Sequence, residues 1–179
     1  MDELACGTRV CHKTIDEGHV APKMLELHLA EVENLIFTLP SQYYRLLLIV
    51  GPTGSGKTRI LKGLSRSKDI PYVNLNLALS QRLLDVDHRE RPLRVHHFLA
   101  DVIDEQSADV VILDNIELLF EPTLHQDPLA CLQGSSRNKA LIVSWGGKYV
   151  GSLLTYAEPG HPEYRRYDRP DAVIVALPS

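Results

Sequence analysis

The 179-residue sequence contains no apolar run that approaches the ~20 residues needed to span a membrane. It also lacks the opening pattern of a secretory signal peptide, because Asp2 and Glu3 lead into a mixed polar stretch. These two absences predict a cytoplasmic protein that makes no membrane contact.

Cysteine is scarce as well: the chain has only Cys6, Cys11 and Cys131. An odd number of cysteines without a secretory signal predicts that there is no disulfide framework. Two of them lie near His12 and His19 in the sequence. That spacing matches no standard zinc pattern, so we expect no metal cluster there.

The sequence has no excess of positive charge that would point to nucleic acid. The net charge is −4, and 44% of the residues are hydrophobic and 23% charged, as in an ordinary soluble globular protein. A local basic patch that contacts DNA stays possible, because the net charge says little about how charges are distributed over the surface. The chain shows no internal repeat, and its length suffices for one domain to bury a core.

One glycine-rich stretch, residues 51–58, fits G-x-x-x-x-G-K-[ST], the pattern of a Walker A phosphate-binding loop. The apolar run Leu46 to Val50 precedes it, and a helix-compatible segment, residues 58–65, follows. Glycines let main-chain amides curl around an anion, and the following helix adds its own N-terminal amides. We therefore predict that ATP is bound by Gly51, Pro52, Thr53, Gly54, Ser55, Gly56, Lys57, Thr58 and Arg59.

Two side chains of this loop have more specific expected roles. Lys57 would reach the β- and γ-phosphates as a catalytic cation, and the Thr58 hydroxyl would hold a Mg²⁺ ion. The apolar segment 109–113 ends in Asp114 and fits a Walker B strand, whose terminal carboxylate reaches the same ion. Thr58 and Asp114 are therefore the predicted metal ligands.

Hydrolysis also needs a group that orients or deprotonates the attacking water. Asn115 follows the Walker B aspartate and can orient water but cannot accept its proton. Glu117 is the nearest carboxylate able to act as the base, although it could instead be a helix N-terminal acid that interacts with the dipole. Ser144, at the end of the expected fourth strand, is a candidate γ-phosphate sensor, and Asn76 could hydrogen-bond the catalytic acid.

Three arginines are candidates for a group that neutralises developing charge on a neighbouring subunit's nucleotide: Arg137, Arg165 and Arg166. A purely solvating role for each remains the alternative. An arginine acting in this way requires self-association, so we predict a homo-oligomer that ATP favours.

The alternation of apolar and helical segments predicts an α/β fold, a P-loop NTPase with a doubly wound, mainly parallel five-stranded sheet. The expected strands are residues 46–50, 72–77, 109–114, 140–145 and 172–177, and the expected helices are residues 24–37, 58–65, 80–87, 93–105 and 126–133. Gly146 and Gly147 are expected to end the fourth strand, and residues 153–169, which are rich in proline, glycine, tyrosine and charge, are expected to contain no strand. Residues 1–23 should be a flexible arm ahead of a nucleotide-binding domain, 24–179.

The chain resembles the BrxF family of small P-loop proteins from type 3 BREX bacteriophage-defence systems. Five segments carry the resemblance: GPTGSGKT, VNLNLALSQRLLD, DVVILDNIELLF, HQDPLACLQGSSRNKALIVSW and LTYAEPGHPEYRRY. It covers about residues 24–177 and implies a bacterial ATPase or ATP-dependent switch that works with other BREX proteins. In such systems host DNA is methylated and phage replication is blocked. The resemblance does not imply that this subunit contacts DNA.

That family also resembles AAA-type ATPases in its nucleotide core, but we expect no C-terminal helical lid after the fifth strand. Its absence would make hydrolysis slow or dependent on assembly. Two other functions stay open: a nucleotide or small-molecule kinase, with Arg165 and Arg166 in a closing lid, or a non-hydrolysing ATP-gated assembly module. A GTPase is disfavoured, because residues 138–141 lack the aspartate of a guanine-specifying N-K-x-D motif.

Overall fold

The computed structural model describes residues 22–178. The predicted arm, residues 1–23, lies almost wholly outside them, and so do Cys6, Cys11, His12 and His19. Helix α1 (Pro22–Ile36) begins two residues before the expected start of the domain. Within the described range, no helix has the length and apolar character to cross a membrane.

Five parallel strands form the centre of the molecule, as the sequence predicts. They are β1 (Leu46–Gly51), β2 (Tyr72–Asn74), β3 (Val110–Asp114), β4 (Ala140–Val150) and β7 (Val173–Ala176). Their order across the sheet is β2-β3-β4-β1-β7. Strand β4 therefore lies between the strand that leads into the phosphate loop and the strand that ends at Asp114.

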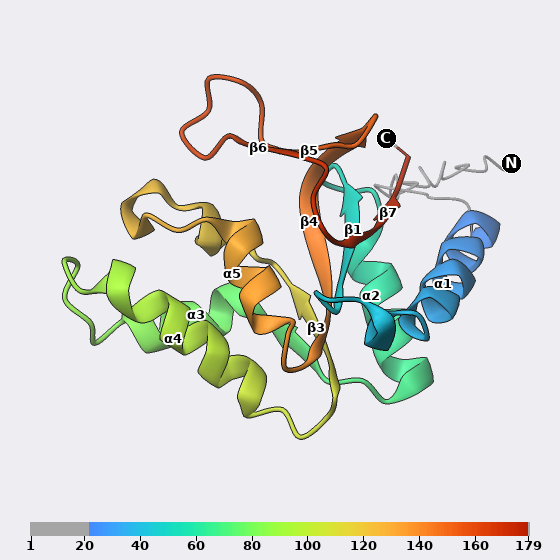
Figure 1. The fold of residues 1–179 in the computed structure, drawn as a ribbon, viewed down its shortest axis with the longest axis horizontal. Helices are drawn as coiled ribbons and strands as arrows, with labels where there is room; N and C mark the ends of the chain where they lie inside the picture. Colours follow the sequence, from blue (N-terminus) through green and yellow to red (C-terminus); the bar gives the residue numbers. More distant parts are fainter. Residues whose placement is uncertain (1–21, 179) are drawn as a thin grey trace, which may run out of the picture.

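Helices cover both faces of this sheet (Figure 1). Helices α1 and α2 (Lys57–Lys68) lie on one side, and α3 (Leu75–Leu83), α4 (Arg91–Asp104) and α5 (Pro128–Ser135) lie on the other. Three short 3-10 turns complete the connections: η1 (Leu39–Ser41), η2 (Glu117–Phe120) and η3 (Pro122–Leu124). The doubly wound α/β prediction is confirmed.

Strand β1 shows why the sheet takes helices on both faces. All six of its residues are buried. Leu46, Leu48 and Val50 point to the side of α3, α4 and α5, whereas Leu47 and Ile49 pack with α1 and α2. Each such side chain contributes about 1.5–3 kcal/mol when fully buried. An amphipathic strand with one polar face could not support this arrangement.

The second strand is shorter than predicted, because a helix begins inside the expected segment 72–77. The side chain of Asn74 accepts a hydrogen bond from the N–H of Leu77 at 3.1 Å and caps α3. Asparagine is among the best N-cap residues. The predicted helix over residues 80–87 therefore starts earlier, at Leu75, and ends at Leu83.

The fourth strand is longer than predicted, so the expectation that Gly146 and Gly147 end it was wrong. Strand β4 runs to Val150 and pairs with β5 (Leu153–Tyr156), which pairs with β6 (Arg165–Asp168), both antiparallel. The sheet thus has seven strands rather than five. Gly147 allows this pairing because a Cβ there would lie 1.9 Å from the carbonyl oxygen of Thr155.

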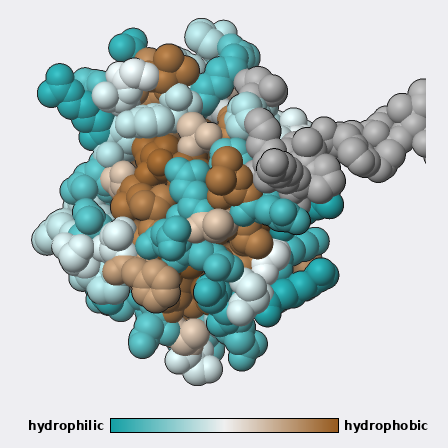
Figure 2. Space-filling model, turned by 90° about the vertical axis from the view of Figure 1, so that its right-hand side faces the viewer, coloured by the Kyte–Doolittle hydropathy of each residue, from teal (hydrophilic) through white to brown (hydrophobic). Residues whose placement is uncertain are grey.

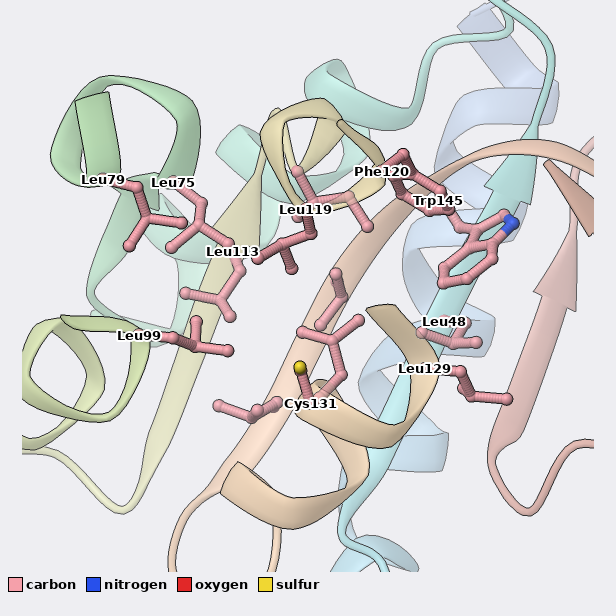
Figure 3. Close-up of a cluster of buried hydrophobic side chains, with 14 of the residues drawn as sticks. Leu48, Leu75, Leu79, Leu99, Leu113, Leu119, Phe120, Leu129, Cys131 and Trp145 are labelled. Carbon is pink, nitrogen blue, oxygen red and sulfur yellow. The ribbon is translucent and has the colours of Figure 1, made fainter. Parts of the chain in front are cut away.

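An aromatic cluster attaches the β5–β6 hairpin to the rest of the domain. Figure 3 shows two of its members, Phe120 and Trp145, next to each other in the core. Phe120 stacks on Tyr156 and meets Trp145 edge to face, at 5.0 Å between ring centroids. The indole N–H of Trp145 donates to the carbonyl of Thr155 at 3.0 Å. Aromatic pairs of this kind contribute ~0.5–1.5 kcal/mol beyond their buried area. The hairpin, strand β4 and turn η2 are therefore packed as one unit.

The remaining elements follow the prediction with shifted ends. Helix α5 starts at Pro128 rather than at residue 126, because the Asp127 side chain caps it by accepting from the N–H of Ala130 at 3.1 Å. Figure 2 shows the side that carries α1, where hydrophobic residues lie among hydrophilic ones. Leu27 and Phe37 are exposed there, while Val32 is buried against α2.

The close approach at Gly147 gives a first prediction. Gly147→Ala should lower the free energy of unfolding by roughly 1–3 kcal/mol, since the new methyl group must push the hairpin away from β4. Gly134→Ala is the matched control, because a Cβ at Gly134 in α5 has open space around it. That variant should be neutral or slightly stabilising. Urea unfolding of both variants tests this, and an equal effect of the two substitutions would contradict it.

Candidate functional site

The phosphate loop connects the end of β1 to the start of α2 at the carboxyl edge of the sheet. Gly54 and Gly56 have φ angles of 83° and 91°, in the left-handed region that glycine favours. A Cβ at Gly51 would lie 2.5 Å from the Oγ of Ser55. The three glycines of the motif are therefore needed for the shape of the loop.

Lys57 folds back over the loop that precedes it. Its Nζ donates to the carbonyl oxygens of Gly51 and Pro52, at 2.7 Å each. Burial lowers the pKa of Lys57 below its ordinary value, while the charges of Asp114 and Glu117 partly oppose that shift. Both carboxylates thus act on the ammonium group through space, which places all three side chains at one end of the sheet.

The loop fits an anion. The Oγ of Ser55 is buried and has no hydrogen-bond partner among the residues that the structure describes. Leaving such a group without a partner costs ~1–3 kcal/mol. A phosphate oxygen in the loop would give this hydroxyl an acceptor, and the first turn of α2 offers unpaired main-chain N–H groups beside it.

Asp114 is the buried polar centre of the site, with 2% of its surface exposed. Tyr72 donates its hydroxyl to Asp114 Oδ2 at 2.6 Å. Burial alone would raise the pKa of Asp114, but hydrogen bonds from Ser144, Tyr72 and Thr58 and from the main chain of Asn115 hold it below its ordinary value. The carboxylate is therefore ionised and oriented.

The same contacts test the predicted metal site. The side chain of Thr58 lies close enough to Asp114 to help lower the pKa of that carboxyl, so a hydroxyl and a carboxylate are near each other at this edge of the sheet. Oxygen ligands of this kind suit Mg²⁺, which binds few protein ligands and keeps several waters. The residues present fit the ion. Ser144, the candidate γ-phosphate sensor, likewise helps to lower the pKa of this carboxyl.

Glu117 lies at the start of η2, and Asn76 holds it in place. Asn76 Nδ2 donates to Glu117 Oε2 at 2.8 Å, while Asn76 Oδ1 accepts from the N–H of Leu118 at 2.8 Å. The structure thus contains the predicted contact between Asn76 and Glu117. Asn76 makes it from the first turn of α3 rather than from a strand end.

Asn115 adopts a left-handed conformation, with φ of 56°. Its N–H donates to Asp114 Oδ1 at 3.0 Å, and its carbonyl accepts from the N–H of Asn76 at 2.8 Å. This sharp change of direction after β3 turns the chain toward α3. Glu117 and not Asn115 therefore reaches the space near the phosphate loop.

Two hollows flank the phosphate loop. One, of about 660 Å³, runs along α2 and is lined by Lys57, Arg59, Lys62 and Arg66 among others. The second, of about 550 Å³, lies between the loop and the β5–β6 hairpin, and its lining includes Thr53, Glu117, Lys148, Tyr156 and Glu163. The predicted ligand Arg59 thus belongs to a basic hollow, and Glu117 to an acidic one.

The candidate arginines lie apart from these side chains. Arg137 comes just before β4 and stacks over Tyr43 and Tyr44, whereas Ser144, which was expected at the end of that strand, lies within it. Arg165 and Arg166 lie on β6. None of the three contacts the phosphate loop of its own chain within the described residues.

Lys139, within the segment examined for guanine specificity, has a structural role. Its Nζ donates to the carbonyl oxygens of Ile103 and Asp104, at 3.1 Å and 3.2 Å, and also to that of Gln106. These carbonyls lie at and just beyond the C-terminal end of α4, where a cation is favourable. The segment therefore stabilises a helix end far from the phosphate loop.

No protein-family model matches the sequence, and no curated protein does. A solved DNA replication initiation factor aligns with 90% of this chain and 48% of its own, at a TM-score of 0.51 and 15% identity. The fold is that of a P-loop NTPase. Caenorhabditis elegans PCH-2 aligns with 73% of this chain and 38% of its own, at a TM-score of 0.40 and 17% identity.

These similarities concern architecture alone. The chain spans less than half the length of either solved structure, and identities this low say nothing of ligand or activity. The first of the two supports the predicted α/β P-loop fold class. One residue of the site escaped sequence analysis. Tyr72 was assigned only to a strand. It lies two residues before Asn74, the residue that pairs with Asp114, so the side chains of Tyr72 and Asp114 lie on the same face of neighbouring strands, which a topology argument could have used.

A second prediction concerns Tyr72. Tyr72→Phe removes the hydroxyl that donates to Asp114 but keeps the ring beneath Lys62. We expect the pKa of Asp114 to rise and the free energy of unfolding at neutral pH to fall by about 1.5–3 kcal/mol, the range for a hydrogen bond to a charged group.

The loss of unfolding free energy in Tyr72→Phe should become smaller as the pH falls. The folded-state pKa of Asp114 lies below its ordinary value, so its contribution is present above the unfolded pKa and is lost as pH falls through the folded pKa. Urea unfolding should therefore show wild type and variant converging in acid. A stability difference that stays constant from neutral to acid pH would contradict the assignment.

Proposed function

We propose that this protein is a Mg²⁺-dependent ATPase. One observation carries the proposal: a phosphate loop with an unpaired buried hydroxyl lies beside an ionised aspartate and a glutamate that an asparagine holds in place. The cation and the two carboxylates are Lys57, Asp114 and Glu117, and they come from three different elements of the fold.

In this mechanism the chain binds the nucleotide, orients the attacking water and accepts a proton from it. The loop amides and Lys57 hold the β- and γ-phosphates and offset the charge that develops on them. Magnesium, when bound by Thr58 and Asp114, would neutralise further phosphate charge. Glu117 takes a proton from water as the water oxygen attacks the γ-phosphorus and the bond to the ADP oxygen breaks. Asn76 fixes one oxygen of that carboxylate and leaves the other free for water.

The binding step is tested by Lys57→Ala. The variant loses the cation that meets the phosphates and should bind a fluorescent ATP analogue at least ~10-fold more weakly. Lys68→Ala, at the far end of the same helix, is the matched control and should bind as the wild type does. Equal affinities of Lys57→Ala and Lys68→Ala would show that the nucleotide lies elsewhere.

The chemical step is tested by Glu117→Gln. The amide keeps the shape of the side chain and an acceptor for Asn76, but it cannot take a proton. We expect turnover to fall by about 100-fold or more while ATP affinity stays nearly unchanged. Glu121→Gln is the control for loss of charge, because Glu121 is a neighbouring carboxylate that accepts a hydrogen bond from Thr123. Unchanged turnover in Glu117→Gln would move the role of base to another group.

The acidic hollow favours one second candidate, phosphoryl transfer to a small acceptor. A space of about 550 Å³ beside Thr53 and Glu117 has room for such a molecule. Product analysis with γ-labelled ATP separates the candidates. Free phosphate supports the ATPase, a labelled acceptor supports a kinase, and intact ATP with retained binding supports a non-hydrolysing assembly module.

The proposed biological setting follows from the resemblance to BrxF proteins. We infer that the ATPase works as a self-associating subunit or switch of a bacterial BREX anti-phage system, together with its other proteins. Support comes from the long matched segments, which include the turn that carries Glu117 and the loop before β6. Arg137, Arg165 and Arg166 remain the proposed sources of a charge supplied to a neighbouring nucleotide.

A further inference from the structure

Strand β6 leaves one edge of the sheet open. It pairs with β5 and with no other strand in the part of the chain that the structure describes. The N–H of Arg169 donates to the carbonyl of Ser152 at 2.8 Å, and the register places these two residues directly opposite each other. This bond identifies which residues of β6 direct their main-chain N–H and C=O groups toward β5.

Hydrogen-bonded pairs alternate along an antiparallel ladder. Residues 165, 167 and 169 therefore direct their main-chain groups toward β5. Arg166 and Asp168 direct theirs away from it, toward solvent, and both side chains are exposed. Tyr167, between them, points to the other face, where its hydroxyl donates to Asp127 at 3.0 Å and its ring packs near Trp145.

This edge is complementary to itself. When β6 is laid antiparallel to β6 of a second copy, about a two-fold axis through Tyr167, Arg166 stands opposite the partner's Asp168. The two residues can then exchange both main-chain hydrogen bonds, and their side chains project from the same face with opposite charges. Symmetry repeats the pair on the other side of the axis.

We propose that β6 is a self-association edge, through which two copies of the chain join their hairpins into one continuous antiparallel sheet. The contact is short, because Arg169 has φ of 47° and leaves the extended conformation. Pro170 then has no N–H to donate. The dimer formed by this edge is consequently weak and depends on protein concentration.

Charges on an edge strand commonly serve to prevent pairing. Here the two charges have opposite sign and are two residues apart, so one two-fold register satisfies both. A shift by two residues in one direction places Arg166 opposite the partner's Arg166, and in the other direction Asp168 opposite the partner's Asp168. The same residues therefore stabilise one register and oppose its neighbours.

The test reverses the charges one at a time and then together. Arg166→Asp and Asp168→Arg each replace two attractive pairs by two repulsive ones and should weaken the dimer by about ten-fold or more. The double variant Arg166→Asp/Asp168→Arg restores opposite charges and should return to within about three-fold of the wild type. Sedimentation equilibrium without nucleotide measures all four proteins, so the result does not depend on ATP hydrolysis.

Cross-linking locates the contact independently. In a background with Cys6→Ser and Cys11→Ser, the double variant Arg166→Cys/Asp168→Cys should form a covalent dimer on mild oxidation, because residues opposite each other in a ladder lie within disulfide range. The double variant Lys148→Cys/Val150→Cys, on the neighbouring strand β4, is the control and should not. A wild-type monomer at all concentrations, a double variant no tighter than the single ones, or equal cross-linking of both cysteine pairs would each overturn the proposal.

Discussion

The buried carboxylate of Asp114 imposes the main constraint on this structure. A charge with 2% exposure is tolerated only if hydrogen-bond donors surround it. Those donors come from three other places in the chain, namely Thr58 after the phosphate loop, Tyr72 on β2 and Ser144 on β4. The strand order β2-β3-β4-β1 brings these side chains to the carboxyl edge of the sheet around Asp114. The same contacts leave the carboxylate ionised, which is the state that a metal ion needs.

Strand β4 connects that carboxylate to the hairpin. It carries Ser144 at the site, then Trp145 in the aromatic cluster, and then continues through Gly147 into the pairing with β5. Phe120 joins the cluster from η2, the turn that begins at Glu117. A displacement of the hairpin would thus also displace Ser144, a partner of Asp114, and the turn η2, which carries the proposed base Glu117. Close packing makes such a displacement a shift of the whole unit rather than of one side chain.

The sequence was sufficient for the parts of the fold that follow from local patterns. The phosphate loop, the five parallel strands and Asp114 could be predicted because apolar runs and a glycine motif determine them. The hairpin was missed because residues 146–147 were interpreted as a stop. Yet Gly151 and Ser152, with φ of 56° and 76°, form the two-residue turn that joins β4 to β5. A signal for that turn was present in the sequence.

The end of β2 was misplaced because the helix cap at Asn74 competes with strand propensity, and one side-chain hydrogen bond decided the outcome.

Other features depend on contacts between distant residues and could not be predicted locally. Asn76 and Glu117 are 41 positions apart and meet only because α3 and η2 both follow neighbouring parallel strands.

The position of each side chain on β6 also distinguishes Arg165 from Arg166. If Arg166 pairs with the partner's Asp168, its side chain is held on the outer face of the hairpin, where it cannot also reach a nucleotide. Arg165, the preceding residue, projects to the opposite face, where its guanidinium donates to the main-chain carbonyl of Tyr164 at 3.0 Å. Self-association through β6 would therefore place the two adjacent arginines in different surroundings, Arg166 at the contact between copies and Arg165 on the other face of the hairpin.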